Sequence, residues 1–366
     1  MRQLGYCLLA IACGTAAAQS RKPVTDEEVR KVHQSMILID THNDVAMKTV
    51  RGMDFGQRAT RGQTDLPRMK EGGVGGLFFA IFVSPSCVEK QQCVQRAIDM
   101  IDSVRYDVVG RYPNDFMLAL TADDVEAAHR QGKIAALMGI EGGHSIQDDL
   151  RVLRTFYQLG ARYMTLTHAN TNNWADSSGD LNNDKVQHHN GLTDFGKQVV
   201  AEMNRLGMLV DVSHVSDKTF WDALETSKAP IFASHSSCRA LCDVPRDMTD
   251  EMIQALAKKG GLININFAPG FLTARKDPPA SVEDVVAHID HVVKLAGIDA
   301  VGIGSDFDGI DSVPVGLEDN SKYMNLTRAL LEKGYTAGQI RKIYGGNMLR
   351  LMRQAEETAR KLQAAR

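Results

Sequence analysis

The chain has 366 residues, of which 43% are hydrophobic, so it is long and apolar enough to bury a large core. Its formal net charge is −3 and both signs are scattered along the sequence, which leaves no basic stripe for nucleic acid or for an anionic membrane surface. A small-molecule substrate fits this composition better.

The N-terminal segment has the pattern of a secretory signal, with Arg2, an apolar centre over residues 4–12 and alanines at 16–18. We expect cleavage after Ala18, which makes residues 1–18 a signal peptide and residues 19–366 a single domain of an exported, periplasmic or secreted protein. An alternative makes Cys13 a lipoprotein cysteine. The apolar centre is too short to cross a bilayer, so we expect no transmembrane span.

Eight short apolar runs along the chain have the character of buried strands, and helical patterns lie between most of them. Such alternation indicates parallel βα units, and eight of them predict an α/β fold of the (β/α)8 TIM-barrel type. The C-terminal pattern over residues 336–362 predicts two helices broken near Gly345 and Gly346. The predicted strands are 37–44, 76–83, 134–140, 163–167, 208–213, 230–234, 261–267 and 300–305, and the other predicted helices are 94–109, 148–158, 193–206, 216–225, 249–257 and 281–295.

Six of these runs end at a side chain that can bind a metal ion or carry a proton. In the first, His42 and Asp44 are two residues apart, so in a strand both point to the same side. Because the carboxyl ends of barrel strands meet at one mouth, we expect the six ends to lie together. The residues at these ends are His42 with Asp44, Glu141, His168, His214, His235 and Asp306.

Five of these residues make a plausible metal centre. The three imidazoles His42, His214 and His235 and the two carboxylates Asp44 and Glu141 suit zinc, but they exceed the four ligands of one tetrahedral site. We therefore expect two Zn²⁺ ions per chain with Glu141 bridging them. A hydroxide held between the two ions would be a nucleophile at neutral pH.

Other polar and sulfur-containing residues receive simpler interpretations. The loop over residues 170–190 follows His168, is polar and lacks periodicity, and its Trp174 is a candidate contact for substrate. An oxidising compartment would favour a disulfide between Cys87 and Cys93. Cys238 and Cys242 are expected to be buried free thiols. The remaining histidines are expected to be structural or on the surface, with four of them in exposed helical stretches, namely His33, His129, His288 and His291.

Six short motifs occur in order between about Val32 and Leu351. Together they resemble the membrane (renal) dipeptidase family of the amidohydrolase superfamily. The chain has no hydrophobic C-terminal tail of the kind that directs a lipid anchor in vertebrate members, so the word membrane is not transferred. The motifs are Thr41-His42-Asn43-Asp44, Glu141-Gly142-Gly143, Leu166-Thr167-His168 with Asn173-Trp174-Ala175-Asp176, Asp211-Val212-Ser213-His214, Ser234-His235-Ser236-Ser237 and Gly304-Ser305-Asp306-Phe307-Asp308-Gly309.

The resemblance implies a binuclear zinc dipeptidase that tolerates a D-residue at the C-terminal position of the substrate, and it suggests a homodimer. It implies that His168 polarises the scissile carbonyl or holds the tetrahedral intermediate, that Arg246 binds the substrate carboxylate and that Asp306 moves the proton. Asp308 is a rival for the last role. The alternative function is an amidohydrolase that acts on another amide, an ester or a β-lactam with the same two metals.

Overall fold

Eight parallel strands form a nearly closed barrel in the computed structural model, which describes residues 23–365. The prediction of a (β/α)8 barrel is thereby confirmed. The predicted signal peptide and Cys13 lie outside the described residues, and the division into a leader and one domain stays a prediction. The barrel strands, in order around the ring, are β1 (Leu38–Asn43), β2 (Val74–Phe82), β4 (Ile134–Glu141), β5 (Ala161–Thr165), β6 (Leu209–Asp211), β7 (Phe232–Ser236), β8 (Leu262–Ile265) and β9 (Val301–Ile303), and a short strand β3 (Phe116–Leu118) pairs with β4 as a side branch.

The ring closes where the first strand meets the segment that follows the last one. The backbone N–H of Asp44 donates to the carbonyl of Phe307 at 2.9 Å, and the N–H of Asp306 donates to the carbonyl of His42 at 3.1 Å. Beneath them, the buried carboxylate of Asp40 accepts bonds from the backbone and the hydroxyl of Ser305 at 2.8 and 2.6 Å. These bonds fix β1 against the chain beyond β9.

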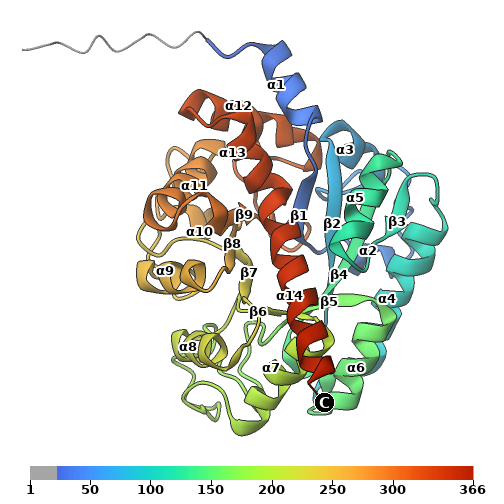
Figure 1. The fold of residues 1–366 in the computed structure, drawn as a ribbon, viewed down its shortest axis with the longest axis vertical. Helices are drawn as coiled ribbons and strands as arrows, with labels where there is room; N and C mark the ends of the chain where they lie inside the picture. The colour runs from blue at the N-terminus through green and yellow to red at the C-terminus, as the bar shows by residue number, and fades with distance from the viewer. Residues whose placement is uncertain (1–22, 366) are drawn as a thin grey trace, which may run out of the picture.

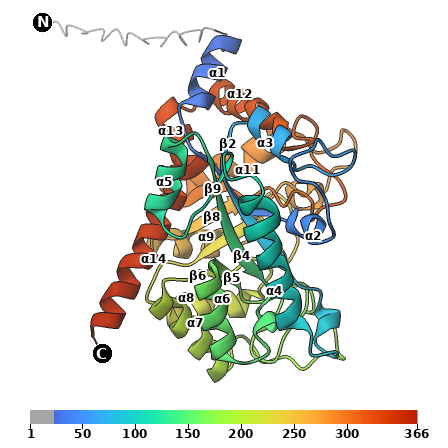
Figure 2. The same ribbon diagram turned by 90° about the vertical axis from the view of Figure 1, so that its right-hand side faces the viewer.

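Helices surround the strands in both ribbon views (Figures 1 and 2). Local sequence explains several of their ends. For example, the hydroxyl of Thr193 accepts the N–H of Gly196 at the start of α7, and Gly207, with φ 84°, ends that helix. The helices are α1 (Asp26–Gln34), α2 (Ala46–Thr49), α3 (Leu66–Glu71), α4 (Cys93–Ser103), α5 (Ala122–Arg130), α6 (Leu150–Leu159), α7 (Asp194–Leu206), α8 (Asp217–Thr226), α9 (Asp250–Lys258), α10 (Pro269–Leu272), α11 (Val282–Ala296), α12 (Tyr323–Lys333), α13 (Ala337–Arg341) and α14 (Asn347–Ala364).

Apolar side chains fill the interior of the barrel at its amino-terminal end. Apolar residues near the starts of the strands, among them Ile39, Leu209 and Phe232, form one buried cluster with Leu351 and Met352 of α14. Figure 1 shows α14 lying across the strands at this end. The opposite mouth, at the carboxyl ends of the strands, is therefore the one left for a site.

The two predicted C-terminal helices are present as α13 and α14, but the chain between them is not broken at Gly345 and Gly346. A π-helical turn over Lys342–Gly346 joins α13 to α14 without interruption. A Cβ atom on Gly345 would lie 2.4 Å from the carbonyl oxygen of Ile37, so this glycine serves close packing against the chain before β1. A second π-helical turn, over Val104–Gly110, continues α4 within the predicted helix 94–109.

Two of the histidines expected in exposed helical stretches are buried and have a structural role. His33 donates to the carbonyl of Gly72 at 2.8 Å, and His288 donates to that of Leu272 at 2.9 Å. The first bond joins α1 to the C-terminal end of α3 and the second joins α11 to that of α10, and helical periodicity alone does not indicate these partners. His129 is exposed, as expected.

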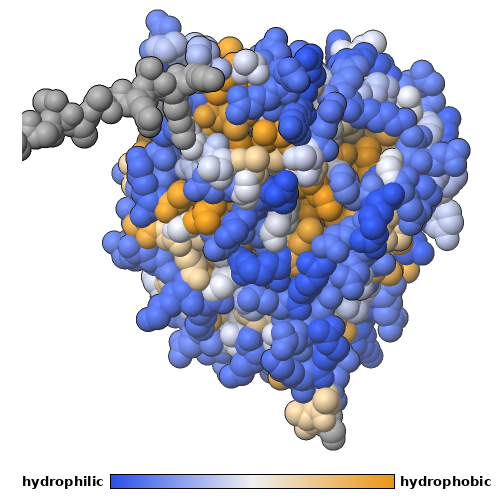
Figure 3. Space-filling view, turned by 45° about the horizontal axis from the view of Figure 1, so that its top comes forward, coloured by the Kyte–Doolittle hydropathy of each residue, from blue (hydrophilic) through white to orange (hydrophobic). Residues whose placement is uncertain are grey.

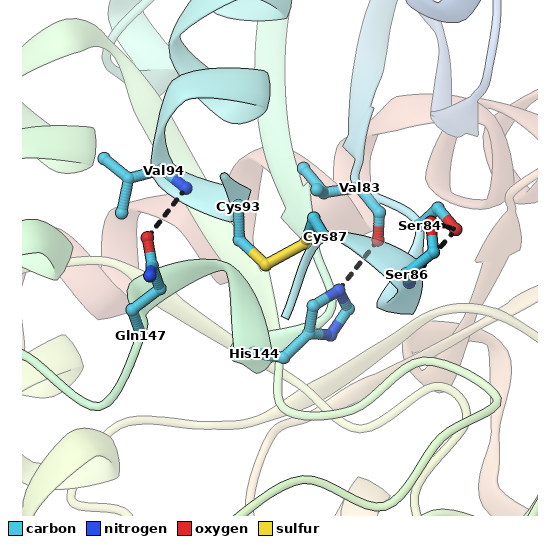
Figure 4. The surroundings of a disulfide bond; sticks show 8 residues. All are labelled: Val83, Ser84, Ser86, Cys87, Cys93, Val94, His144 and Gln147. Atoms are coloured by element: carbon cyan, nitrogen blue, oxygen red, sulfur yellow. Dashed lines mark hydrogen bonds between the residues drawn. A yellow bond between two sulfur atoms is a disulfide. The ribbon is translucent and has the colours of Figure 1, made fainter. Parts of the chain in front are cut away.

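The cysteine predictions are confirmed. Cys87 and Cys93 form a disulfide at the start of α4, and Figure 4 shows it beside His144, whose Nε2 donates to the carbonyl of Val83 at 2.7 Å. Cys238 and Cys242 are buried free thiols.

The outer surface is largely hydrophilic, and in Figure 3 the apolar residues on the visible face gather mainly in its hollows. Within residues 23–365, no helix combines the length and the apolar character that crossing a bilayer requires.

Candidate metal centre

The five predicted ligands meet at the carboxyl ends of four strands. His42 belongs to β1 and Asp44 follows that strand, Glu141 is the last residue of β4 and His235 lies within β7. His214 stands three residues beyond β6, in the left-handed backbone region with φ 68°. A histidine seldom adopts this conformation, and such positions concentrate at functional sites.

Glu141 lies at the centre of the group. Its Oε1 is 3.4 Å from Nε2 of His42, 3.2 Å from Nε2 of His214 and 3.5 Å from Nε2 of His235. Nε2 of His42 is also 3.4 Å from Oδ2 of Asp44. Among the described residues, three groups of atoms could each hold an ion. Two of them share Glu141, one with His42 and Asp44 and the other with His214 and His235, and the third consists of His42, His235 and Asp306.

The spacing and partners of these atoms fit metal ions. Nε2 of His42 is buried and has no hydrogen-bond partner among the described residues, although it faces two carboxylates. Two ligand atoms of a tetrahedral zinc ion, each about 2.0–2.1 Å from the metal, lie about 3.3 Å apart. The separations between Glu141 and the imidazoles are close to that value.

The protonation states of three ligands, His214, His235 and Glu141, suit metal binding, which requires neutral imidazoles and ionised carboxylates, whereas burial raises the pKa of Asp44. Burial lowers the pKa of His214 and that of His235 well below the usual range, so both rings are neutral. Burial alone would raise the pKa of Glu141, but His42 and His168 hold it well below its ordinary value. This carboxylate therefore stays ionised.

The site attracts positive charge at His42. Burial by itself lowers the pKa of this imidazole, but Tyr163, Glu141 and Asp44 outweigh that effect and raise it well above the usual value. A group of carboxylates that favours a proton at this point equally favours a divalent cation.

His168 lies beside this centre, three residues beyond β5. Its Nε2 is 3.8 Å from Oε1 of Glu141, and its ring is 4.6 Å from that of Phe82. Burial lowers the pKa of His168, so its imidazole is neutral near pH 7 and can donate one hydrogen bond without carrying a charge.

Asp306 also lies close to the centre, three residues beyond β9. Its Oδ1 is 3.9 Å from Nε2 of His42, and Nδ2 of Asn266 donates to its Oδ2 at 2.9 Å. Like His214, it has a left-handed backbone, with φ 62°. Burial raises the pKa of Asp306, which brings this carboxyl nearer to the range in which it can take and return a proton.

Asp308, the rival acid, has a different environment. Its Oδ1 pairs with the ammonium group of Lys48 and accepts the backbone N–H of Gln63 at 3.0 Å. Asp306 lines the cavity over the ligands, and Asp308 is not among its lining residues. The geometry thus favours Asp306 for proton transfer.

Arg246 is held close to the ligands by its own hydrogen bonds. Nη1 donates to the hydroxyl of Ser236 and Nη2 donates to the carbonyl of His235, each at 2.7 Å. Its guanidinium lies 5.5 Å from the ring of Phe271, and within residues 23–365 it forms no ion pair with a carboxylate. Arg246 is not among the residues that line the cavity over the centre, so a contact between its guanidinium and a substrate carboxylate stays a prediction.

A cavity of ≈ 470 Å³ opens over the centre and is of a size that suits a small ligand. Asp44, Glu141, His168, His214 and Asp306 all line it.

Trp174, the predicted contact for substrate, occupies a different place. Its ring is 1% exposed and packs edge-on against Phe195 at 6.4 Å, and it is not among the residues that line this cavity. A contact between Trp174 and substrate stays a prediction, and the packing indicates that the ring anchors the loop over residues 170–190.

Sequence reasoning missed the residues behind the ligands. Nδ1 of His42 contacts the hydroxyl of Tyr163 at 2.8 Å, and Nδ1 of His235 contacts that of Ser234 at 2.7 Å. The hydroxyl of Ser234 in turn donates to Asp211 at 2.6 Å. No pattern in the sequence singled out Tyr163 or Ser234, and the one available signal, an aspartate three residues before a predicted ligand, pointed to Asp211 alone.

The sequence matches the model of the membrane dipeptidase family, peptidase family M19, over residues 26–366. Among solved structures, the probable dipeptidase PvdM from Pseudomonas aeruginosa has a TM-score of 0.81 at 26% identity, with 91% of this chain and 98% of that chain covered. A metallopeptidase from Rhodobacter sphaeroides, bound to a phosphinate mimic of the dipeptide L-Ala-D-Ala, has a TM-score of 0.78 at 29% identity, with 87% and 99% covered. A dipeptidase described as a metallopeptidase of family M19 has a TM-score of 0.78 at 30% identity, with 87% and 99% covered. Since the family match extends over most of the sequence and through every predicted ligand, this chain belongs to the membrane dipeptidase family of metallopeptidases.

Proposed function

We propose that this protein is an exported zinc dipeptidase that acts as a homodimer and holds two zinc ions per chain, with Glu141 bridging them. The observation that carries the proposal is the sharing of Glu141 by two sets of ligand atoms. The remaining ligands divide evenly, with His42 and Asp44 on one ion and His214 and His235 on the other.

When bound, the two ions would supply Lewis acidity and lower the pKa of the attacking water. The protein provides the remaining chemistry. Arg246 binds the substrate carboxylate through paired hydrogen bonds and so fixes the peptide over the centre. His168 donates to the carbonyl oxygen as negative charge develops there. Asp306 takes the proton from the water and returns it to the departing amine.

The substrate is proposed to be a dipeptide with a free C-terminal carboxylate, and a D-residue is expected to be tolerated at that end. The R. sphaeroides relative, whose bound mimic represents L-Ala-D-Ala, supports this choice by similarity. The guanidinium of Arg246 is hydrogen-bonded to Ser236 and to the backbone of His235 but forms no ion pair with a carboxylate among the described residues, which supports the requirement for a free carboxylate independently of that relative.

The test is hydrolysis of L-Ala-L-Ala and L-Ala-D-Ala by the purified protein, before and after removal of metal with a chelator and after restoration of zinc. The expected result is cleavage that the chelator abolishes and zinc restores. An amidated dipeptide, an ester and a β-lactam serve as comparison substrates. Cleavage of one of these in preference to both dipeptides would contradict the dipeptidase proposal and favour a different amidohydrolase.

A further inference from the structure

One buried hydroxyl group touches the metal centre without belonging to the proposed ligand set or to the reaction. Tyr163 lies in β5 inside the barrel, where its ring packs against Phe78 and Phe232 with centroids 5.3 and 5.4 Å away. Its hydroxyl reaches across the interior to Nδ1 of His42 in β1, at 2.8 Å. A phenylalanine would fill the same apolar space, so packing alone does not explain the hydroxyl.

The neighbouring strand makes room for this tyrosine. Gly139 of β4 pairs with Tyr163 in the sheet, and a Cβ atom at Gly139 would lie 1.9–2.2 Å from the atoms of the phenol ring. The glycine in this strand thus allows the ring to cross the barrel toward His42. Gly139 and Tyr163 together thus bring a hydroxyl group of the barrel interior into contact with His42, a proposed ligand.

The contact determines which nitrogen of His42 faces the ion site. Nε2 points at Asp44 and Glu141, so its lone pair must be free if it is to bind metal, and the proton must then reside on Nδ1. Nδ1–H can donate to the oxygen of Tyr163. Histidine ligands commonly donate their second N–H to an oxygen in this way, which fixes both the tautomer and the direction of the ring.

The second ion site has a different support. Nδ1 of His235 contacts the hydroxyl of Ser234, which donates to the carboxylate of Asp211. His42 therefore depends on a tyrosine hydroxyl and His235 on a serine bonded to an aspartate. The loss of one support should affect one site and leave the other in place.

We propose that Tyr163 is a positioning residue for the metal centre, whose hydroxyl accepts the Nδ1–H bond of His42 and thereby sets the zinc affinity of the site formed with Asp44. This inference depends on the binuclear centre proposed above. It adds a role for a residue that lies outside the catalytic cavity.

The test compares Tyr163→Phe with Tyr344→Phe, its matched control. Tyr344 is equally buried, and its hydroxyl bonds to Thr327 at 2.8 Å rather than to any proposed ligand. Zinc is titrated into the metal-free protein in competition with a chromophoric chelator, which yields the dissociation constants of the two sites. Tyr163→Phe is expected to weaken one site by about 10- to 100-fold and to leave the other unchanged, whereas Tyr344→Phe changes neither.

A second readout follows the proton directly. In zinc-loaded protein labelled with ¹⁵N-histidine, His42 is expected to show a protected Nδ1–H signal that Tyr163→Phe exposes to solvent exchange and Tyr344→Phe does not. This measurement distinguishes positioning from a general loss of stability. Unchanged zinc constants and an unchanged His42 signal in Tyr163→Phe would overturn the inference while leaving the binuclear centre standing. Failure of the wild-type protein to bind two zinc ions would instead overturn the proposed centre itself.

Discussion

Oε1 of Glu141 lies 3.4 Å from Nε2 of His42, although the two residues belong to strands that are not neighbours in the barrel. The same oxygen lies 3.2 Å from Nε2 of His214. One carboxylate therefore faces the ligands of both candidate ion sites. The proposed binuclear centre depends on the position of this carboxylate more than on any other contact.

Glu141→Gln should remove metal and activity together. The amide is nearly the same size as the carboxylate but carries no negative charge, so it cannot balance the charge of two cations. We expect zinc content to fall and the rate of dipeptide hydrolysis to drop at least ~100-fold, since even the loss of an outer contact commonly costs 10–100-fold. Elemental analysis and initial rates on the same sample check this. A variant that keeps two zinc ions and full activity would exclude a bridging Glu141.

Asp306→Asn should slow the reaction while both zinc ions stay bound. Asp306 is the acid proposed to move the proton, and loss of such a group typically lowers kcat by about 100- to 10,000-fold. Asp308→Asn is the matched control, because Asp308 pairs with Lys48 outside the cavity lining. Steady-state kinetics with parallel zinc analysis separates the two variants. A larger loss of kcat in Asp308→Asn than in Asp306→Asn would assign the proton transfer to Asp308 instead.

Arg246→Ala should weaken binding of substrates that have a free carboxylate. Charge-assisted hydrogen bonds contribute about 1.5–3 kcal/mol, so KM should rise about 10- to 100-fold while zinc stays bound. The comparison is a dipeptide amide, for which wild type and variant should have similar kinetic constants. If the KM values of the dipeptide and the amide rise equally in Arg246→Ala, Arg246 does not bind the substrate carboxylate.

Buried histidines away from the site should make stability depend on pH. Burial lowers the pKa of His33 and that of His288, so the unfolded chain binds protons more readily than the folded one. Their contribution is complete above about pH 6.5, the ordinary value, and is lost as the pH falls from there to the folded pKa, at up to about 1.4 kcal/mol per pH unit for each group. Unfolding free energies near pH 7.5 and 5.5 should therefore differ less in His33→Gln than in wild type. His129→Gln, at an exposed position, should behave as wild type, and an equal change in both variants would count against burial as the cause.

The disulfide should contribute modestly to stability. Cys87 and Cys93 are six residues apart, and closing so short a loop in the unfolded chain contributes about 2 kcal/mol in the chain-entropy model. The double variant Cys87→Ser/Cys93→Ser should unfold at a lower temperature than wild type. Dithiothreitol should lower the wild-type Tm and leave that of the variant unchanged. An equal response of both proteins to the reductant would contradict a stabilising bridge.

The sequence could predict that the proposed ligands lie together because of how a parallel barrel is built. His42, Glu141 and His214 each end an apolar run, and the carboxyl ends of all the strands meet at one mouth. Pattern and topology together therefore brought residues far apart in the chain to one place. The same logic placed Asp306 near them.

The remaining features depend on contacts that no periodicity reveals. Tyr163 lies within a strand and reads as an ordinary core aromatic, and only the folded barrel brings its hydroxyl to His42. Gly345 resembles a helix breaker, but it serves close packing against Ile37. Trp174 was predicted to face substrate because it stands in a polar loop, and its burial against Phe195 follows from how that loop folds back on α7. In each case the partner lies on a distant segment.

The measurement that tests the central claim most directly is the zinc content of the purified wild-type protein, with the rate of dipeptide hydrolysis followed as zinc is returned to the metal-free form. The account predicts close to two zinc ions per chain and activity that reaches its maximum at the second equivalent. Full activity with a single ion, or with no metal at all, would contradict a binuclear centre bridged by Glu141.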